Sequence, residues 1–342
     1  MKATINDVAK LSGVSIKTVS RVMNNEPSVR QLTREKVQVA VKELNYQPNL
    51  AARNLAGTKS FTIAYVYDNP NAYYILDMQE GILSACRQQG FELLINPCDS
   101  QQENIVEDII DTIKHARVAG LVLTPPFSEQ PEFVKRITAL DIKVVRIMSG
   151  DVAPDDLSAC VMVNDRDASQ TITQHLIDLG HKKIAFIAGG AEHMSTIERY
   201  KGYRRALKAN DIEYNKDLVI EGEYSFESGV NGAKQLMATD RAQENRPTAI
   251  FSCNDEIAAG ALFAARLMNI NIPDQLSIAG FENSPFSRQT WPKLTTANQP
   301  NTQIAHDAAS LLISQIRKQK VQNITSQYTP QLVVRDSTGK YV

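Results

Sequence analysis

The chain has 342 residues, of which 43% are hydrophobic and 22% are charged, a composition typical of a folded protein with two or three domains. It contains no apolar run near the roughly 18 residues that a membrane helix needs, and its first residues lack the apolar stretch of a signal peptide. Its four cysteines include no C-x-x-C pair, which argues against a zinc site or a redox dithiol. We therefore expect a soluble, cytoplasmic protein without a metal or another cofactor.

The net charge of −1 conceals an asymmetry along the chain. Residues 1–60 contain ten Lys or Arg against four Asp or Glu, whereas residues 61–342 are mildly acidic. A small cationic segment ahead of a larger acidic body suggests that the first segment binds a polyanion. On charge alone, a short basic terminus exposed to solvent is an equally good interpretation.

The first segment predicts three short helices. Thr4 and Asp7 form a capping pattern for the first helix, and Gly13 ends it. Ser15 caps a second helix after a tight connection, so the pair reads as a helix-turn-helix. A third helix, opened by Thr33, covers the other two with an apolar face made of Val37, Ala40, Val41 and Leu44.

The start of the second helix is polar and cationic, as a helix that enters the major groove of DNA requires. Ile16, Lys17 and Arg21 are the candidate base readers, because Lys and Arg donate to guanine and an apolar side chain suits the thymine methyl. The full set of candidate DNA-binding residues in this segment is Thr4, Ser15, Ile16, Lys17, Thr18, Ser20, Arg21 and Asn24. Phosphate contacts are expected from Thr18, Ser20 and Asn24. An isolated Lys/Arg pair would more simply be solvated surface.

A short helical stretch follows the third helix. Pro48 breaks the chain, Asn49 caps the stretch and Gly57 ends it. Such a helix is too short to be stable alone, and it exposes Leu55 without a core of its own to join.

Two segments carry a family resemblance: residues 4–24 read TINDVAKLSGVSIKTVSRVMN, and residues 45–55 read NYQPNLAARNL. They resemble the DNA-binding head and hinge of the lactose-repressor (LacI/GalR) family of bacterial transcription regulators. The resemblance implies that Leu55 enters the minor groove at the operator centre and kinks the DNA, and that Asn49 contacts the phosphate backbone. It also implies a hinge that orders only on specific DNA.

From residue 61 onward, short β-branched runs alternate with helical patterns, which indicates an α/β fold with parallel strands and right-handed crossovers. Candidate strands span 61–67, 91–96, 120–124, 143–147, 160–163, 184–188, 219–223, 249–253 and 277–281. Candidate helices include 73–89, 104–117, 168–179 and 256–268. Roughly nine strands exceed one comfortable sheet, so we expect two similar lobes with function at the carboxyl ends of the strands.

The resemblance extends to the body, which is similar to the family's regulatory core and to periplasmic sugar-binding proteins. It implies a small all-α helix-turn-helix head plus an α/β core of two Rossmann-like lobes. The expected domains are the head at 1–47, the hinge helix and linker at 48–60, and an effector-binding and dimerisation core at 61–342. Lobe 1 is expected at about 61–161 and 293–322, with a returning helix at 302–318. Lobe 2 is expected at about 162–292 and 323–342, with a last strand near 327–335. The cleft between the lobes is then the expected ligand site.

Polar and aromatic side chains follow several of the predicted strands. Carboxylates, amides and guanidinium groups suit the hydroxyls of a sugar, and aromatic rings suit its C–H faces. The candidate effector-binding residues are Asp68, Tyr73, Tyr74, Arg146, Arg199, Tyr224, Asn254, Asp255, Glu282 and Gln299. By resemblance, the residues at family effector positions are Arg199, Tyr224, Asn254, Glu282 and Gln299. Without that resemblance, polar residues at strand ends are common in any α/β protein, and Tyr73 and Tyr74 could equally pack at a helix start.

Two residues depart from the family pattern. Glu282 and Met148 each stand where an aspartate is common, so the ligand need not be that of a well-known relative. Arg146 beside Arg199 could favour an acidic sugar, whereas a salt bridge from Arg146 to Asp68 or Glu282 is the simpler interpretation.

An enzyme and a secreted solute-binding protein are the alternatives. The chain has none of the nucleotide-binding, serine-hydrolase or zinc-protease motifs, and its five histidines are scattered; only His193 falls in a loop that could edge the cleft. A secreted binding protein would have no use for the head. The sequence therefore predicts a repressor that binds double-stranded operator DNA with palindromic half-sites as a homodimer and responds to a mono- or oligosaccharide, with a sugar acid or glycoside as variants.

Overall fold

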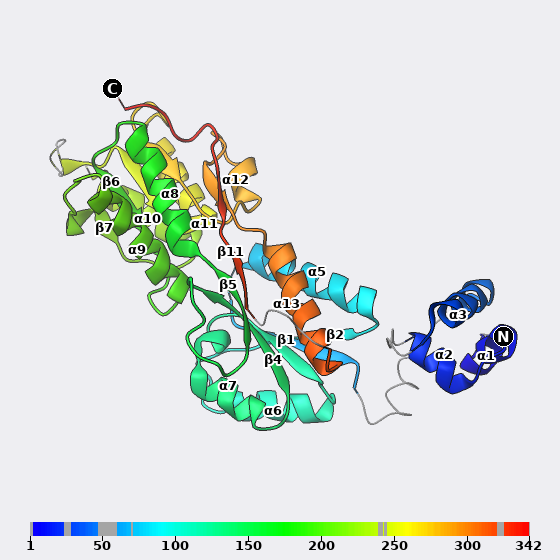
Figure 1. Cartoon of the computed structure of the whole chain (residues 1–342). Helices are drawn as coiled ribbons and strands as arrows, with labels where there is room; N and C mark the ends of the chain where they lie inside the picture. The colour runs from blue at the N-terminus through cyan, green and yellow to red at the C-terminus, as the bar shows by residue number, and fades with distance from the viewer. Residues whose placement is uncertain are drawn as a thin grey trace.

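The computed structural model describes residues 3–23, 29–46, 60–69, 71–238, 242, 245–319 and 325–341. They form a three-helix head and an α/β body of two lobes (Figure 1), so the predicted fold class is confirmed. None of the helices within these ranges is both long and apolar enough to cross a bilayer. The predicted hinge helix, with Asn49 and Leu55, lies outside the described residues, and so does Asn24.

The head consists of α1 (Ile5–Ser12), α2 (Ile16–Met23) and α3 (Gln31–Glu43). Thr4 begins α1 as predicted, because its backbone N–H and its hydroxyl both donate to Oδ2 of Asp7, at 2.8 and 2.7 Å. The third helix begins earlier than Thr33, because the carbonyl of Arg30 accepts the N–H groups of Thr33 and Arg34. The helices close over a buried core made of Val8, Val19, Val22, Val37 and Ala40.

Lobe 1 is built on a six-stranded parallel sheet in the order β11-β5-β4-β3-β1-β2. Its strands are β1 (Thr62–Tyr67), β2 (Glu92–Pro97), β3 (Gly120–Leu123), β4 (Lys143–Ser149), β5 (Ala159–Val163) and β11 (Thr325–Tyr328). Helices α5 (Ala72–Gln89) and α13 (Asn301–Ile316) pack with one apolar core. Helices α6 (Ile105–His115) and α7 (Pro131–Thr138), with the short turn η1 (Phe127–Glu129), pack with a second core. Both faces of the sheet are therefore covered, as a parallel sheet requires.

Helices α5 and α13 touch backbone to backbone (Figure 1). A Cβ placed on Gly81 of α5 would lie 2.2 Å from the carbonyl oxygen of Thr302 and 2.7 Å from the Cβ of Ala305. This position therefore needs glycine for close approach. The contact ties α13, which follows directly from the cleft, to α5.

Lobe 2 has a four-stranded parallel sheet in the order β7-β6-β8-β9 and a separate antiparallel pair, β10 with β12. The strands are β6 (Ile184–Ile187), β7 (Val219–Ile220), β8 (Ala249–Ser252), β9 (Ser277–Ala279), β10 (Thr296–Asn298) and β12 (Gln331–Val333). The helices are α8 (Asp165–Asp178), α9 (Met194–Ala209), η2 (Lys216–Leu218), α10 (Phe226–Leu236), α11 (Asp255–Leu267) and α12 (Phe286–Gln289). One apolar core, which includes Phe186, Tyr203 and Phe251, joins the sheet to these helices.

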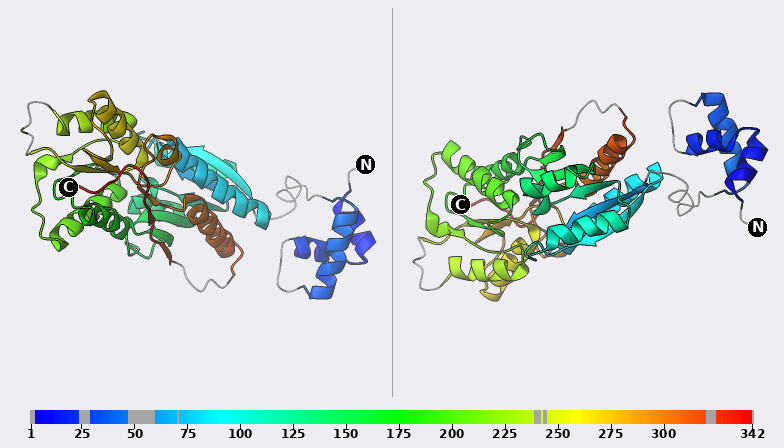
Figure 2. Two further views of the ribbon diagram at one scale, coloured as in Figure 1. Left: turned by 90° about the horizontal axis from the view of Figure 1, so that it is seen from above. Right: turned by 90° about the horizontal axis from the view of Figure 1, so that it is seen from below.

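The chain passes between the lobes after β5, after β10 and after β11, and its described end lies among the helices of lobe 2 (Figure 2). The single strand predicted near 327–335 is wrong, because residues 325–328 pair with β5 in lobe 1 and residues 331–333 pair with β10. The return to lobe 2, expected at about 323, comes after residue 328. The physical reason is that β5 would otherwise be an unpaired edge strand, and Thr325–Tyr328 covers that edge.

Candidate functional sites

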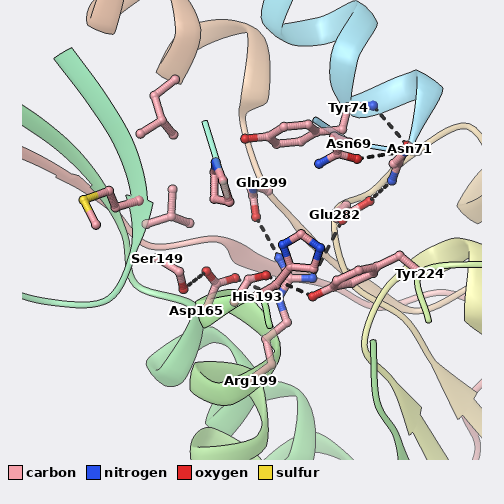
Figure 3. Close-up of a pocket in the computed structure, with 15 residues that line it drawn as sticks. Asn69, Asn71, Tyr74, Ser149, Asp165, His193, Arg199, Tyr224, Glu282 and Gln299 are labelled. Atoms are coloured by element: carbon pink, nitrogen blue, oxygen red, sulfur yellow. Dashed lines mark hydrogen bonds and ion pairs between the residues drawn. The ribbon is translucent and has the colours of Figure 1, made fainter. Parts of the chain in front are cut away.

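A cavity of about 60 Å³ lies between the lobes, at the carboxyl ends of the strands (Figure 3). Side chains from both lobes meet there, and Figure 3 shows polar groups of lobe 1, such as Asn71 and Ser149, together with those of lobe 2, such as Arg199 and Glu282. The lining residues are Asn69, Asn71, Tyr74, Pro125, Ile147, Met148, Ser149, Val163, Asp165, His193, Ser195, Arg199, Tyr224, Glu282 and Gln299.

Arg199 is at the centre of the polar side of the cavity. It lies on α9 and is only 3% exposed. Its Nε donates to Oδ1 of Asp165 at 2.8 Å, and its Nη1 donates to the carbonyl of Cys253 at 2.7 Å. The ring of Phe281 covers its guanidinium carbon at 3.8 Å. Burial opposes the charge, but the groups that face the guanidinium, Asp165 first among them and Glu282 included, together outweigh burial and keep the pKa of Arg199 above its ordinary value.

Glu282 follows β9 and reaches across the cavity. Its backbone has φ +101°, a conformation that only a structured turn imposes on a residue with a side chain. Oε2 accepts a hydrogen bond from Nδ2 of Asn71 in lobe 1 at 3.0 Å, and Oε1 lies 3.7 Å from Nη1 of Arg199. Burial raises the pKa of Glu282 to about 8, and Arg199 only partly counters that rise.

The mouth of the cavity on the lobe 2 side is formed around Tyr224. Its hydroxyl shares hydrogen bonds with Oγ of Ser195 at 2.9 Å and Oγ1 of Thr196 at 2.8 Å, both in the first turn of α9. His193 lies edge-on to the Tyr224 ring at 5.5 Å. An aromatic face and several hydroxyls are thus fixed beside Arg199.

Five of the predicted effector residues line the cavity, and these are Tyr74, Arg199, Tyr224, Glu282 and Gln299. Asn254 and Asp255 were also predicted to contact the effector, but neither lines the cavity. The side chain of Asn254 caps α11 by accepting from the N–H of Ile257 at 2.9 Å. Asp255 accepts from the N–H of Ser284 at 2.7 Å and from the hydroxyl of Thr296 at 2.6 Å. Both are fully buried, and the hydrogen bonds of Asp255 hold the turn that carries Glu282.

Asp68, Tyr73 and Arg146 also lie outside the lining. Asp68 accepts from the backbone N–H of Ser100, and Tyr73 packs edge-on against Phe286. These two side chains are therefore engaged in contacts with other parts of the protein.

Arg146, which was predicted in the cleft, is held away from the cavity by other partners. It is 1% exposed, and its Nη1 donates to Oδ2 of Asp155 at 3.1 Å while its Nε donates to Ser158 at 2.8 Å. Arg146 does form a salt bridge, as the simpler interpretation predicts, but its partner is Asp155 and not Asp68 or Glu282. Arg146 therefore brings no second cation to the cavity.

Sequence reasoning missed Asn69, Asn71, Ser149 and Asp165. Asp165 follows β5 after a single residue and hydrogen bonds with Ser149 across the lobes, so the position after a strand was an available signal. Asn71 caps α5 by accepting from the N–H groups of Tyr73 and Tyr74, and no sequence pattern separates that role from its contact with Glu282. Within the described residues, no group of three His, Cys, Asp or Glu is arranged to hold a metal ion.

The start of α2 presents the candidate DNA-binding residues of the head. Ile16 is 49% exposed, and Ser15, Lys17 and Arg21 are exposed beside it, while Thr18 and Ser20 are half-buried. Ser15 caps the helix by accepting from the N–H of Thr18 at 3.1 Å, as Thr4 caps α1. An exposed apolar side chain at a cationic helix start fits the predicted contact with base edges.

Comparisons with known protein families match both parts of the chain. Residues 4–49 match the model of bacterial regulatory proteins of the lacI family, and residues 173–338 match that of a periplasmic binding protein-like domain. The chain is 31% identical over 339 residues to the HTH-type transcriptional repressor PurR of Vibrio campbellii, with 99% of each chain covered. It is 30% identical over 339 residues to catabolite control protein A of Priestia megaterium, with 99% of this chain and 100% of that one covered.

Solved structures agree with this similarity. The lac repressor dimer bound to operator and the anti-inducer ONPF aligns with a TM-score of 0.75 and 26% identity, over 99% of this chain and all of that one. The complex of the transcriptional regulator CelR with cellobiose aligns with a TM-score of 0.73 and 27% identity, over 98% of this chain and all of that one. These relatives are regulators of transcription and not enzymes, as the sequence predicts.

Proposed function

Because the chain belongs to the LacI family of bacterial regulatory proteins, we propose that it is a repressor that binds a palindromic operator as a homodimer. A small sugar or sugar derivative that binds in the cleft between the lobes controls the affinity of the repressor for the DNA. The observation that carries the proposal is the pairing of an exposed, cationic helix start in the head with a buried, polar cleft around Arg199 in the body.

The chemistry of the cleft supports a sugar-sized effector. Carboxylates, amides and hydroxyls line the cavity together with an apolar surface made of the Tyr74 ring and the side chains of Ile147, Met148 and Val163. Polar groups that fix orientation beside a largely apolar wall are typical of small-molecule sites. The relative CelR was solved with cellobiose.

Effector entry requires the cleft to open. The cavity of about 60 Å³ is smaller than the roughly 300 Å³ of a small ligand pocket, and direct contacts such as Asn71 to Glu282 bridge the lobes. A ligand therefore replaces contacts between the lobes by contacts with itself. The difference in contacts between the two states is what shifts the DNA-binding equilibrium.

Exposed apolar side chains on the body support a homodimer. Leu76 on α5 is 59% exposed, Phe263 and Leu267 on α11 are 46% and 59% exposed, and Trp291 is 74% exposed. Phe263 and Leu267 are four residues apart on one helix and so share a face, and contiguous exposed apolar groups of this kind mark interfaces between chains. A two-fold dimer would present two heads to the two half-sites of a palindrome.

The test is binding of the full chain to symmetric duplexes taken from the DNA next to its own gene, measured by fluorescence polarisation in dilute salt. We expect one duplex to bind at least about a thousandfold more tightly than unrelated DNA, as specific sites usually do. Leu55→Ala should reduce that preference while leaving non-specific binding nearly unchanged, whereas Leu140→Ala, an exposed leucine on lobe 1, should behave as wild type. Absence of preference for any symmetric duplex would refute the proposed function.

A further inference from the structure

The charges around the cavity do not balance. Of the described residues that line it, Arg199 is the single guanidinium or ammonium group, and it faces two carboxylates, Asp165 and Glu282. A third carboxylate, Glu129 of η1, lies outside the lining: one of its oxygens accepts from the N–H of Met194, the first residue of α9, at 3.3 Å, and the other is buried without a hydrogen-bond partner. The cavity thus has an excess of negative charge when its carboxyl groups are ionised.

Arg199 already donates hydrogen bonds to other groups of the protein. Its Nε and Nη1 make the 2.8 and 2.7 Å hydrogen bonds to Asp165 and the Cys253 carbonyl, and its Nη2 donates to Oε1 of Gln299 at 3.4 Å. The 3.7 Å approach to Glu282 is longer than any of these and beyond normal hydrogen-bond distance. The guanidinium is therefore mainly the counter-ion of Asp165.

Glu282 has no cation of its own. Its one hydrogen bond across the cleft comes from the neutral amide of Asn71, and the lobe 1 wall behind is made of neutral side chains such as Ile147 and Met148. His193, the other titratable base in the lining, is 3.1 Å from the exposed carboxylate of Glu192. A buried carboxylate that must share its counter-charge with a second carboxylate is costly to ionise, which agrees with the raised pKa of Glu282.

We propose that the effector supplies the missing charge, and that it is an amino sugar whose protonated amine pairs with Glu282. This inference rests on the proposed function, because it assumes that the effector occupies this cleft. The ammonium group replaces the Asn71 amide at Glu282, and the ring C–H face lies on the apolar wall formed by Ile147, Met148 and Val163. The hydroxyls remain for Tyr224 and Gln299.

The same charges disfavour an acidic sugar, which the sequence left open on account of Arg146. That guanidinium is held by Asp155 away from the cavity, so a ligand carboxylate would meet Asp165 and Glu282 with no unused cation. A neutral sugar could donate hydroxyls to Glu282, but it would leave the carboxylate either uncompensated or protonated. An amine is the group that makes ionised Glu282 favourable.

The experiment compares sugars that differ only at the amine, using calorimetric titration of the full chain at pH 6.5. The probes are D-glucosamine with D-glucose and N-acetyl-D-glucosamine, and D-galactosamine with D-galactose and N-acetyl-D-galactosamine. We expect at least one amine to bind tenfold or more tightly than both of its neutral counterparts. Because binding ionises Glu282, the measured enthalpy should also change with the ionisation heat of the buffer, as released protons are taken up by it.

Glu282→Gln tests the assigned residue. It should reduce the preference for the amine to less than threefold and abolish proton release, whereas Glu213→Gln, which changes an exposed carboxylate of lobe 2, should change neither. The wild-type comparison does not depend on whether the variant folds.

Tighter binding of the neutral sugars or of D-glucuronate, no binding of either amine at 10 mM, or an undiminished preference in Glu282→Gln would each overturn the proposal. A chain that binds its operator but ignores both amines refutes this inference alone, whereas a chain without operator binding refutes the proposed function.

Discussion

Replacing Glu282 by Gln should change how the stability of the protein depends on pH. The ordinary pKa of this carboxyl is 4.5, and burial raises it to about 8 in the folded chain. A raised pKa means that the folded state favours the protonated acid. Its contribution to stability is therefore complete below about pH 4.5 and is lost as the pH rises through 8. Glutamine keeps the shape of the neutral acid and removes the ionisation.

The size of the effect follows from the two pKa values. At about 1.4 kcal/mol per pH unit, ionisation of Glu282 in the unfolded chain, which the folded chain resists until about pH 8, lowers the free energy of unfolding by about 2 kcal/mol by pH 6 and by about 5 kcal/mol by pH 9. The free energy of unfolding of Glu282→Gln, relative to wild type, should therefore increase by about 3 kcal/mol between those two pH values. Glu129, whose pKa burial raises to about 7, titrates in both proteins and drops out of the difference, whereas the charge of Asp255 helps to raise the pKa of Glu282 and is part of the effect.

Urea unfolding at pH 6, 7.5 and 9 measures this difference. The single tryptophan, Trp291, lies in the same lobe as Glu282 and reports the unfolding of that lobe by fluorescence. Glu213→Gln, at an exposed carboxylate, should follow the wild-type profile. If the difference between Glu282→Gln and wild type stays constant within about 0.5 kcal/mol across the range, then Glu282 is not an uncompensated buried acid and the reasoning fails.

Three further substitutions test other parts of the molecule. Gly81→Ala should destabilise the protein by about 1–3 kcal/mol, because its Cβ would meet a carbonyl of α13 at 2.2 Å; an unchanged urea midpoint would contradict the close packing. Leu267→Glu, at a leucine that is 59% exposed, should convert the proposed dimer to a monomer in sedimentation, and a persistent dimer would move the interface elsewhere. Arg21→Ala should cost about 1–3 kcal/mol of operator affinity and relax the preference at one base pair. Unchanged discrimination among operator variants would remove Arg21 from the base readers.

The sequence predicted the elements of the fold well because their signals are local. Capping at Thr4 and Ser15 and the alternation of β-branched runs with helices are set by near neighbours in the chain. The last strand was the exception. The split between residues 325–328 and 331–333 depends on which strand each half pairs with, β5 or β10, and those partners lie about 165 and about 35 residues away in the chain.

The site was only half predictable for a related reason. A residue after a strand is close to the cleft, but whether its side chain faces the cavity depends on which neighbouring group forms a hydrogen bond or an ion pair with it. Arg146 and Asp255 were expected in the cleft, and each instead pairs with groups whose position the sequence does not reveal, Asp155 and Ser284. Asp165 had the same positional signal as the residues that were named, and the resemblance did not point to it.

The placement of β11 has a consequence for synthesis on the ribosome. The core of the head is complete once residue 40 has emerged, because Val8, Val19 and Ala40 all lie within it. The sheet of lobe 1 gains its last strand only with residues 325–328. Chains emerge from the amino terminus at about 5–20 residues per second, so β5 remains a bare edge for many seconds while the rest of the receptor is translated. Nascent chains should therefore depend on chaperones that shield that edge, long after the DNA-reading unit has folded.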